Sequence, residues 1–388
     1  MQGRDPDEPH RAATPLELFF DLCFVVAVAQ AAVALHHELA DGHLIEGTVA
    51  YLMVFFAIWW AWMGFTWFAS AYDTDDVLYR LLTFFQIAGV LVIAAGVPRA
   101  FASDFLIMTI GYSLMRVGLV AQWLRAAAEH PAGRPTALRY AVGVTAVQAF
   151  WLARLLVPPE VATISFIVGV ALELAVPLWA ERRRRTPWHA HHVTERYGLF
   201  TIIVLGECVL AVTVAIQEAF EAGGLSPSLA LLAVGAFVLL GALWWAYFKH
   251  HAAEERVLVD RNNFVWGYGH YLVFAALAAV GAGLQVAVDR THEEVAISGT
   301  VAALAVALPV AIFLIAAWSV SLAGRPLRTI WPIAATAAAG VLVALLAGGN
   351  VPLAVTLMAT AVAAVVGVSA WRASHAVAQI APEPRGAT

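Results

Sequence analysis

Stretches of about 20 consecutive apolar residues recur along nearly the whole chain, and they limit the folds that it can adopt. Each stretch is long enough to cross a hydrocarbon core of ~30 Å. Lipid offers no hydrogen-bond partner to the backbone, so such stretches must be helical. The chain is 62% hydrophobic and 13% charged, whereas a soluble domain is typically about half apolar and a quarter charged. The predicted fold class is therefore all-α, a polytopic transmembrane helical bundle.

Hydropathy predicts twelve membrane spans. Their ranges are roughly 15–37, 44–70, 79–98, 102–124, 137–157, 161–180, 196–217, 227–249, 264–288, 295–321, 328–347 and 350–371. If the N-terminus is placed in the cytoplasm, eighteen of the 22 Lys and Arg residues fall in cytoplasmic segments. Cytoplasmic loops of membrane proteins carry such an excess of basic residues. We therefore predict that both termini are cytoplasmic.

An offset of 185 residues superposes two features of the first half on the second half. It relates Cys23 to Cys208, and Trp59-Trp60-Ala61 to Trp244-Trp245-Ala246. Six spans followed by six in the same orientation would form a parallel repeat about an axis along the membrane normal. The alternative is a chance similarity between Trp-rich apolar segments. The predicted organisation is a cytoplasmic tail (1–13), a first half (14–180), a basic connection (181–195), a second half (196–371) and a cytoplasmic tail (372–388).

Ionisable residues inside predicted spans are the main candidates for function, because each is costly in lipid unless it is paired, hydrated or useful. Glu17 and Asp21 are four residues apart and share one helix face. Two neighbouring acids resist joint ionisation, so we expect Arg116 or His270 as a partner and a polar cavity open to the cytoplasm. The alternatives are an N-terminal dipole contact for Glu17 and a packing role for Asp21 and Glu207. The embedded set is Glu17, Asp21, Arg116, Glu173, Glu207 and His270.

Other polar and aromatic residues are secondary candidates. Trp59 and Trp60 lie too deep for an interfacial belt and either line a pocket or pack. The acidic loop from Asp73 to Asp76 either acts as a gate or is a solvated turn. Loop histidines have no partner at a recognisable ligand spacing, so we predict that they are solvated and that no metal site exists; these are His189, His191, His192, His250 and His251.

Three segments of the sequence are distinctive: TPLELFFDLCFVVAVAQ at 14–30, WWAWMGFTWFASAYDTDD at 59–76 and ERYGLFTIIVLGECVLAV at 195–212. In these segments the sequence resembles a known family, the bacterial low temperature requirement A (LtrA) proteins, and a fourth segment, YGHYLVFAALAAVGAGLQ at 268–285, fits less tightly. The resemblance covers about 14–290 and implies a multi-pass protein of the bacterial cytoplasmic (inner) membrane, without implying a reaction. Its motifs point to Glu17, Asp21, Tyr72, Asp73, Asp76, Glu195, Gly198, Glu207 and His270.

The leading functional hypothesis is a secondary transporter or permease, with proton coupling through the embedded acids. In this hypothesis Asp21 and Glu207 exchange protons, Arg116 sets the pKa values of these two acids, and His270 relays protons. The sequence has no GxxxxGK[ST] phosphate loop, which argues against ATP-driven transport by this chain. Two alternatives stay open: a membrane-embedded enzyme or cofactor protein for haem, quinone or lipid, and a sensor or assembly factor. An enzyme is not favoured, and the cofactor is unknown. Expected partners are the lipid bilayer and a small molecule or ion, with no nucleic acid.

Overall fold

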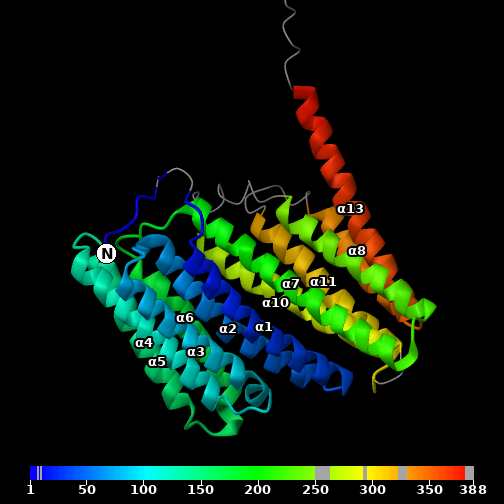
Figure 1. The fold of residues 1–388 in the computed structure, drawn as a ribbon, viewed down its shortest axis with the longest axis horizontal. Helices are drawn as coiled ribbons and strands as arrows, with labels where there is room; N and C mark the ends of the chain where they lie inside the picture. The colour runs from blue at the N-terminus through cyan, green and yellow to red at the C-terminus, as the bar shows by residue number, and fades with distance from the viewer. Residues whose placement is uncertain (7, 9–10, 250–262, 292–294, 322–329, 381–388) are drawn as a thin grey trace, which may run out of the picture. The chain divides into compact units, whose positions relative to one another are not determined.

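The computed structural model describes residues 1–388 except 7, 9–10, 250–262, 292–294, 322–329 and 381–388 (Figure 1). Its described part contains twelve helices and no strand, which confirms the all-α prediction. The helices are α1 (Pro15–Ala40), α2 (Leu44–Tyr72), α3 (Val77–Phe101), α4 (Leu106–Glu129), α5 (Arg134–Arg154), α6 (Pro159–Ala180), α7 (Ala190–Gly223), α8 (Pro227–Phe248), α10 (Asn263–Asp289), α11 (Gly299–Ser321), α12 (Trp331–Ala347) and α13 (Val351–Ile380).

Ten of these helices are long and apolar enough to cross a membrane. The two others correspond to predicted spans but differ from the ten: α5 is less apolar, and α12 has only 17 residues. Unpaired backbone groups cannot be left in lipid, so ten such helices imply a bilayer environment. The protein is a polytopic helical membrane protein.

Local sequence explains where several helices begin. Thr14 caps α1 in a capping box with Glu17, and Pro15 occupies the first turn. Asp76 caps α3 by accepting a hydrogen bond from the Tyr79 backbone N–H, and Ser226 caps α8 in the same way. The helices differ most from the predicted boundaries at α7, which begins at Ala190 instead of residue 196, and at α13, which ends at Ile380 instead of residue 371.

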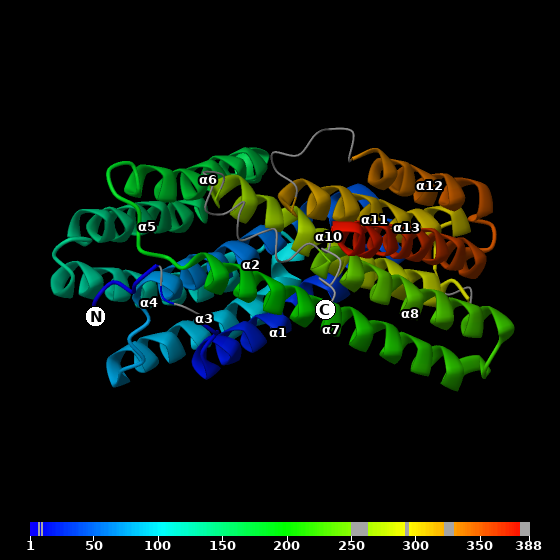
Figure 2. The same cartoon turned by 90° about the horizontal axis from the view of Figure 1, so that it is seen from above.

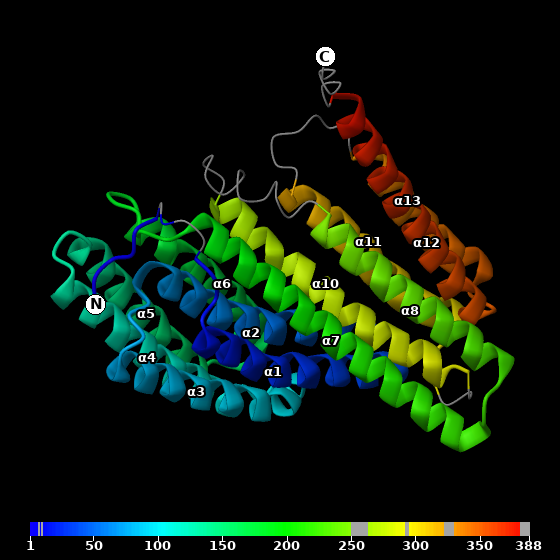
Figure 3. The same cartoon turned by 45° about the horizontal axis from the view of Figure 1, so that its top comes forward.

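The chain divides into two compact units, Met1–Glu207 and Cys208–Thr388, with the boundary inside α7. In the first unit α3 packs against α1 and α4, α4 packs against α5, and α5 packs against α6 (Figure 2). In the second unit α10 packs against α11, and α13 packs against both α8 and α12 (Figure 3). Each unit is described by itself below. The predicted halves, 14–180 and 196–371, stay predictions.

Glycines bring α3 and α4 close together. A Cβ atom added to Gly111 would lie 2.5 Å from the backbone nitrogen of Ile93, and one added to Gly96 would lie 2.6 Å from that of Met108. Because the neighbouring atoms belong to the backbone, they cannot rotate away. Small residues let helices approach closely in membranes, where packing replaces the hydrophobic effect as the driving force.

We therefore expect Gly111→Ala to destabilise the first unit. Overpacking of this kind typically costs about 1–3 kcal/mol. Gly206→Ala is the matched control, because a Cβ atom at Gly206 in α7 would meet nothing within 4 Å. Thermal unfolding of the detergent-purified protein measures both variants. Equal midpoints for Gly111→Ala and the wild type would contradict the close contact of α3 and α4.

Candidate functional site

A fully buried group of charged side chains joins α1 to the first turns of α7 in the first unit. We call it the acid–base cluster: Glu17, Asp21, His192 and Arg196. Arg196 donates from Nε to Asp21 Oδ2 (2.9 Å) and from Nη2 to Asp21 Oδ1 (2.5 Å). Its Nη1 lies 3.0 Å from Glu17 Oε1, and His192 Nε2 lies 3.2 Å from the same carboxylate. All four residues are 0% exposed.

The spacing of four residues is repeated on both helices. Glu17 and Asp21 are one turn apart on α1, and His192 and Arg196 are one turn apart on α7. Glu17 contacts His192, and Asp21 contacts Arg196, across the same separation of 175 residues. Residues i and i+4 lie above one another on a helix face, so the two helices run parallel in this region with acids facing bases.

Neighbouring side chains complete the shell of the acid–base cluster. Trp62 of α2 donates its indole N–H to Asp21 Oδ1 (2.7 Å), and Thr66 Oγ1 lies 3.4 Å from Arg196 Nη2. Glu17 Oε2 accepts the Thr14 backbone N–H at 2.8 Å. Within the described residues, four buried atoms here lack a hydrogen-bond partner: His192 Nδ1, the Tyr79 hydroxyl, and Glu17 Oε1 and Arg196 Nη1, which face each other as an ion pair. The carboxylates are held in place, but the cluster is not saturated with hydrogen bonds.

A second buried carboxylate, Glu173 of α6, is saturated. Its Oε1 accepts from Arg116 Nη2 (3.0 Å), Trp151 Nε1 (3.0 Å) and the Tyr112 hydroxyl (3.2 Å). Its Oε2 accepts from Trp60 Nε1 at 2.8 Å. The donors come from α2, α4 and α5, so one side chain ties four helices together. With one Arg for one Glu and four donors on its two oxygens, this pair suits a structural lock.

The remaining embedded candidates lie outside these two clusters. Glu207 is 9% exposed and has no hydrogen-bond or ion-pair partner among the described residues. His270 belongs to the second unit, where Nε2 lies 3.1 Å from the Tyr247 hydroxyl and Nδ1 lies 2.8 Å from the Trp266 carbonyl oxygen. A carbonyl only accepts, so Nδ1 donates and the Tyr247 hydroxyl donates to Nε2.

The secondary candidates Tyr72, Asp73, Asp76 and Glu195 lie around the end of the first unit that carries the N-terminus, whereas Trp59 and Trp60 lie in the middle of α2. Trp59 is 1% exposed and packs against Phe56 and Trp60. The Tyr72 hydroxyl lies 3.2 Å from His130 Nδ1, and Glu195 Oε2 accepts the Ala13 backbone N–H at 2.9 Å. Asp76 pairs with Arg125 and caps α3, while Asp75 pairs with Arg80 at 2.7 Å. Most of these contacts fix helix ends.

Two expectations about partners were wrong. We expected Arg116 or His270 to neutralise Glu17 and Asp21, but Arg196 does so, and Arg116 pairs with Glu173 instead. We also expected solvated loop histidines, but His189 and His192 are buried, at 7% and 0% exposed. His250 and His251 lie outside the described residues. The shared spacing of four residues in His192 and Arg196 is the sequence signal that points to this partnership.

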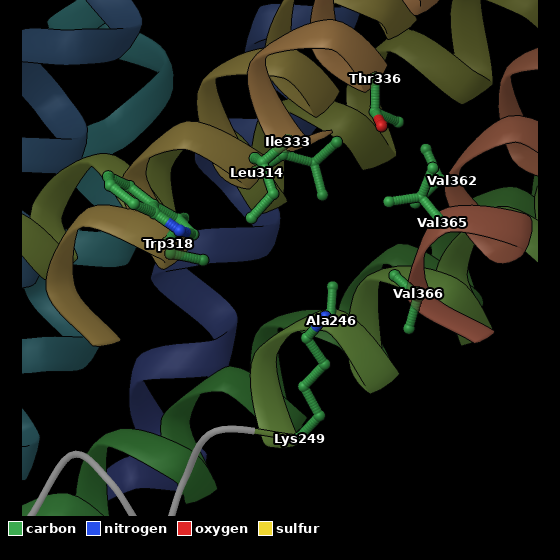
Figure 4. A pocket seen from close by; sticks show the side chains of 10 residues that line it. Ala246, Lys249, Leu314, Trp318, Ile333, Thr336, Val362, Val365 and Val366 are labelled. Atoms are coloured by element: carbon green, nitrogen blue, oxygen red, sulfur yellow. The ribbon is translucent and has the colours of Figure 1, made fainter. Parts of the chain in front are cut away.

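A small cavity lies in the second unit among α8, α11, α12 and α13 (Figure 4). Apolar side chains such as Leu314 and Val366 line most of it, and Lys249 reaches it from the end of α8. Lys249 Nζ donates to Ser369 Oγ at 2.7 Å. The water-accessible space is about 30 Å³, which is room for about one or two water molecules. The cavity is therefore too small for an organic ligand in this conformation.

We expect Arg196→Gln to destabilise the first unit strongly, because two buried carboxylates would lose their only guanidinium. Removing one partner of a buried ion pair typically costs about 3–5 kcal/mol. Arg80→Gln is the control, since the Arg80–Asp75 pair is about half exposed and such surface pairs contribute about 1 kcal/mol or less. Thermal unfolding in detergent compares the two. Adding Asp21→Asn to Arg196→Gln should restore part of the loss, and additive losses would contradict the pairing.

Asp73 makes stability depend on pH. It follows the last residue of α2, is 5% exposed, and burial raises its pKa to about 6, with Glu17 raising it further and Arg11 opposing. An unfolded Asp ionises near 3.8, so its contribution is fully present below that pH and is lost as pH rises through about 6. Asp73→Asn should therefore match the wild type near pH 4 and exceed it above pH 7 by up to about 3 kcal/mol.

Unfolding midpoints across this pH range measure the effect of Asp73→Asn. Asn keeps the acceptor that Asp73 Oδ1 offers to the Asp75 backbone N–H (3.0 Å). Asp75→Asn is the control, because Arg80 lowers the pKa of that exposed carboxylate. A difference between Asp73→Asn and the wild type that does not change with pH would contradict the raised pKa.

The chain was compared with known families and structures. Residues 12–370 match the family described as bacterial low temperature requirement A protein (LtrA). An uncharacterized protein of Rhizobium meliloti (strain 1021) is 28% identical over 283 residues, which cover 69% of this chain and 67% of that protein. No solved structure matches the chain. Because the family match covers most of the spans and all of the residues of both buried clusters, this protein belongs to the bacterial LtrA family.

Proposed function

We propose that this protein is a proton-coupled secondary transporter of the bacterial cytoplasmic membrane, and that the acid–base cluster is its proton site. The observation that carries the proposal is the composition of the cluster. Two carboxylates, one guanidinium and one imidazole lie together, each 0% exposed, inside a unit built from membrane-spanning helices. Embedded ionisable groups of this kind are typical of proton relays in pumps and transporters.

The charge balance of the cluster favours the binding of one proton. With Glu17 and Asp21 ionised, Arg196 charged and His192 neutral, the net charge is one negative unit. A buried group of charges is most stable when it is neutral, because an uncompensated charge is costly in low dielectric. One proton on either carboxylate or on His192 makes the cluster neutral. The nearest other charged groups, Arg11 and Asp73, lie 3.9 Å apart as a pair and leave this balance unchanged.

The geometry also supports proton exchange. His192 is the member closest to the start of α7, and its Nδ1 has no hydrogen-bond partner among the described residues. Imidazole can pass a proton between its two nitrogens. In this proposal His192 passes the proton to Glu17 and Asp21, and Arg196 takes the tuning role that we first assigned to Arg116. Glu207 and His270 stay candidates for the transport path.

The proposed parallel repeat is consistent with the packing inside each unit. In the first unit the contacts follow the order α3–α4, α4–α5 and α5–α6. In the second unit they follow α10–α11, α11–α12 and α12–α13, which are the helices that the offset of 185 residues brings into correspondence. Parallel repeats of six helices are a common architecture of secondary transporters. The order of neighbouring helices favours transport over an enzymatic role, although the extensive packing of α13 against α8 has no equivalent between α6 and α2 among the described residues.

Asp21→Asn tests the proton site. Asn is a neutral mimic of the protonated acid, so the cluster keeps one negative and one positive charge and the protein should fold. We expect substrate-driven proton movement to be lost, because the site can no longer change its charge at this position. The measurement uses proteoliposomes with an internal pH dye, to which fractions of a bacterial small-molecule extract are added. The control is Asp75→Asn, which removes an exposed acid of the first unit.

Infrared difference spectroscopy during a pH titration provides a readout that needs no substrate. A protonated carboxyl group has a C=O band that ionised carboxylates lack. We expect a titrating band in the wild type and in Asp75→Asn, and its loss or shift in Asp21→Asn and Glu17→Gln. Proton-coupled flux and a carboxyl band that are both unchanged in Asp21→Asn would rule out the proposed site.

A further inference from the structure

A cavity of about 510 Å³ opens at the end of the first unit opposite the N-terminus. The start of α2, the end of α3, the start of α4, the end of α5 and the start of α6 surround it. Charged side chains among its lining residues are Glu46, Asp104 and Arg154. A cavity of this size is in the range of small-molecule sites. None of these residues belongs to the two buried clusters described above.

Arg154 is the most unusual side chain in this cavity. It is 9% exposed, and its guanidinium carbon lies 4.9 Å from the ring centre of Phe105 and 5.2 Å from that of Phe166. Its Nη2 donates to the Ala162 carbonyl oxygen at 3.1 Å, while its Nε has no hydrogen-bond partner. Within the described part of the chain, no carboxylate lies within ion-pair distance of it.

The other buried arginines are all paired with acids. Arg196 contacts Glu17 and Asp21, Arg116 contacts Glu173, and Arg11 lies 3.8 Å from Glu8 and 3.9 Å from Asp73. Burying an unpaired guanidinium is costly, and cation–π contacts offset only part of that cost, about 0.5–2 kcal/mol each. An anionic ligand would supply the missing partner. Guanidinium groups bind carboxylates in a two-pronged geometry.

The surroundings of Arg154 indicate which anion fits. The larger cavity itself is lined by the rings of Phe101 and Phe105 and by apolar side chains such as Met53. An apolar group attached to the anion can therefore pack against these rings. Glu46 lies exposed among the lining residues of the larger cavity, and Asp104 is already paired with Arg99 at 3.6 Å. A free carboxylate on the rim repels a second negative charge, which favours a monoanion over a dicarboxylate or a phosphate dianion.

We propose that the cavity at Arg154 binds a small organic monocarboxylate, with its carboxylate on the guanidinium and its apolar part against the aromatic rings. If this ligand is the substrate of the proposed transporter, the substrate class is a monocarboxylate, and that step rests on the proposed function. Binding itself does not depend on proton coupling. Arg154 is then the residue that recognises the substrate, and the neighbouring rings select for its apolar part.

Binding of benzoate and benzamide to the detergent-purified full chain tests this site by isothermal titration calorimetry. The two probes have the same ring, and only benzoate is charged. We expect benzoate to bind and benzamide not to bind. Arg154→Gln should weaken benzoate binding by at least about tenfold, because a charge-assisted hydrogen-bonded pair is lost. Arg80→Gln is the control, since its side chain is 55% exposed and lies outside the cavity, and it should bind benzoate like the wild type.

Thermal unfolding shows whether Arg154→Gln is still folded. Removing an unpaired buried charge should leave the ligand-free midpoint unchanged or raise it, and benzoate should raise the midpoint of the wild type but not that of Arg154→Gln. Arg154→Lys, which keeps the charge without the planar fork, should retain part of the binding. Three results would overturn the proposal. Benzoate and benzamide could bind equally well, or Arg154→Gln could bind benzoate as tightly as the wild type does. The third is that the wild type binds neither benzoate nor butyrate, a smaller monocarboxylate.

Two further outcomes separate this proposal from its alternatives. If native mass spectrometry finds phosphatidylglycerol retained by the wild type and lost in Arg154→Gln, and benzoate does not displace it, then the cavity holds a lipid headgroup and the proposal is overturned. Asp21→Asn should bind benzoate like the wild type. If Asp21→Asn loses the carboxyl infrared band and still binds benzoate, both proposals are supported. If Asp21→Asn keeps the band and still binds benzoate, the proposed proton site is ruled out and the proposed carboxylate site is not.

Discussion

The guanidinium of Arg196 is the contact on which the arrangement of the first unit depends. It binds both oxygens of Asp21 and reaches Glu17, and Trp62 of α2 donates to the same Asp21 carboxylate. Through these contacts one side chain of α7 sets the register of α1 and orients α2. A charge at this depth cannot be left without a partner, so the three helices can shift against one another only if the pairing survives.

The two buried clusters contain similar residue types but differ in their charge balance. Glu173 receives four donors and faces one Arg, so its charge is balanced and both its oxygens are hydrogen-bonded. The acid–base cluster has two acids for one Arg, and among the described residues four polar atoms in and beside it have no hydrogen-bond partner. A satisfied pair resists change and fixes helices. An unbalanced one has a reason to take up and release a proton, and this difference supports our functional assignment.

Arginine placement follows the same logic across the first unit. Arg11, Arg116 and Arg196 each lie near a carboxylate, whereas Arg154 faces aromatic rings and a cavity. The three paired arginines neutralise carboxylates of the same unit. For Arg154, we propose that a ligand supplies the negative charge. If both proposals hold, the proton and the carboxylate bind at separate places in one unit.

Much of the fold follows from the sequence. Spans are predicted by local hydropathy, and the helices agree with the predicted ranges apart from their ends. The costs of embedded charge also identify Glu17, Asp21, Arg116 and Glu173 as residues that need partners. Their partners could not be predicted. Arg196 and His192 stand in a basic, His-rich stretch that is typical of a cytoplasmic loop, and the helix that carries them begins at Ala190.

What the sequence by itself determined is which segments enter the membrane and which side chains are costly there, because both depend on the composition of one segment at a time. Only the tertiary structure decided that Asp21 meets Arg196, that Arg116 meets Glu173 and that Arg154 meets no acid. These pairings depend on which helix faces lie against each other. Packing over the whole unit, including the close approach of α3 and α4 at Gly111, determines which helix faces are in contact. The sequence of a single segment therefore does not predict these pairings.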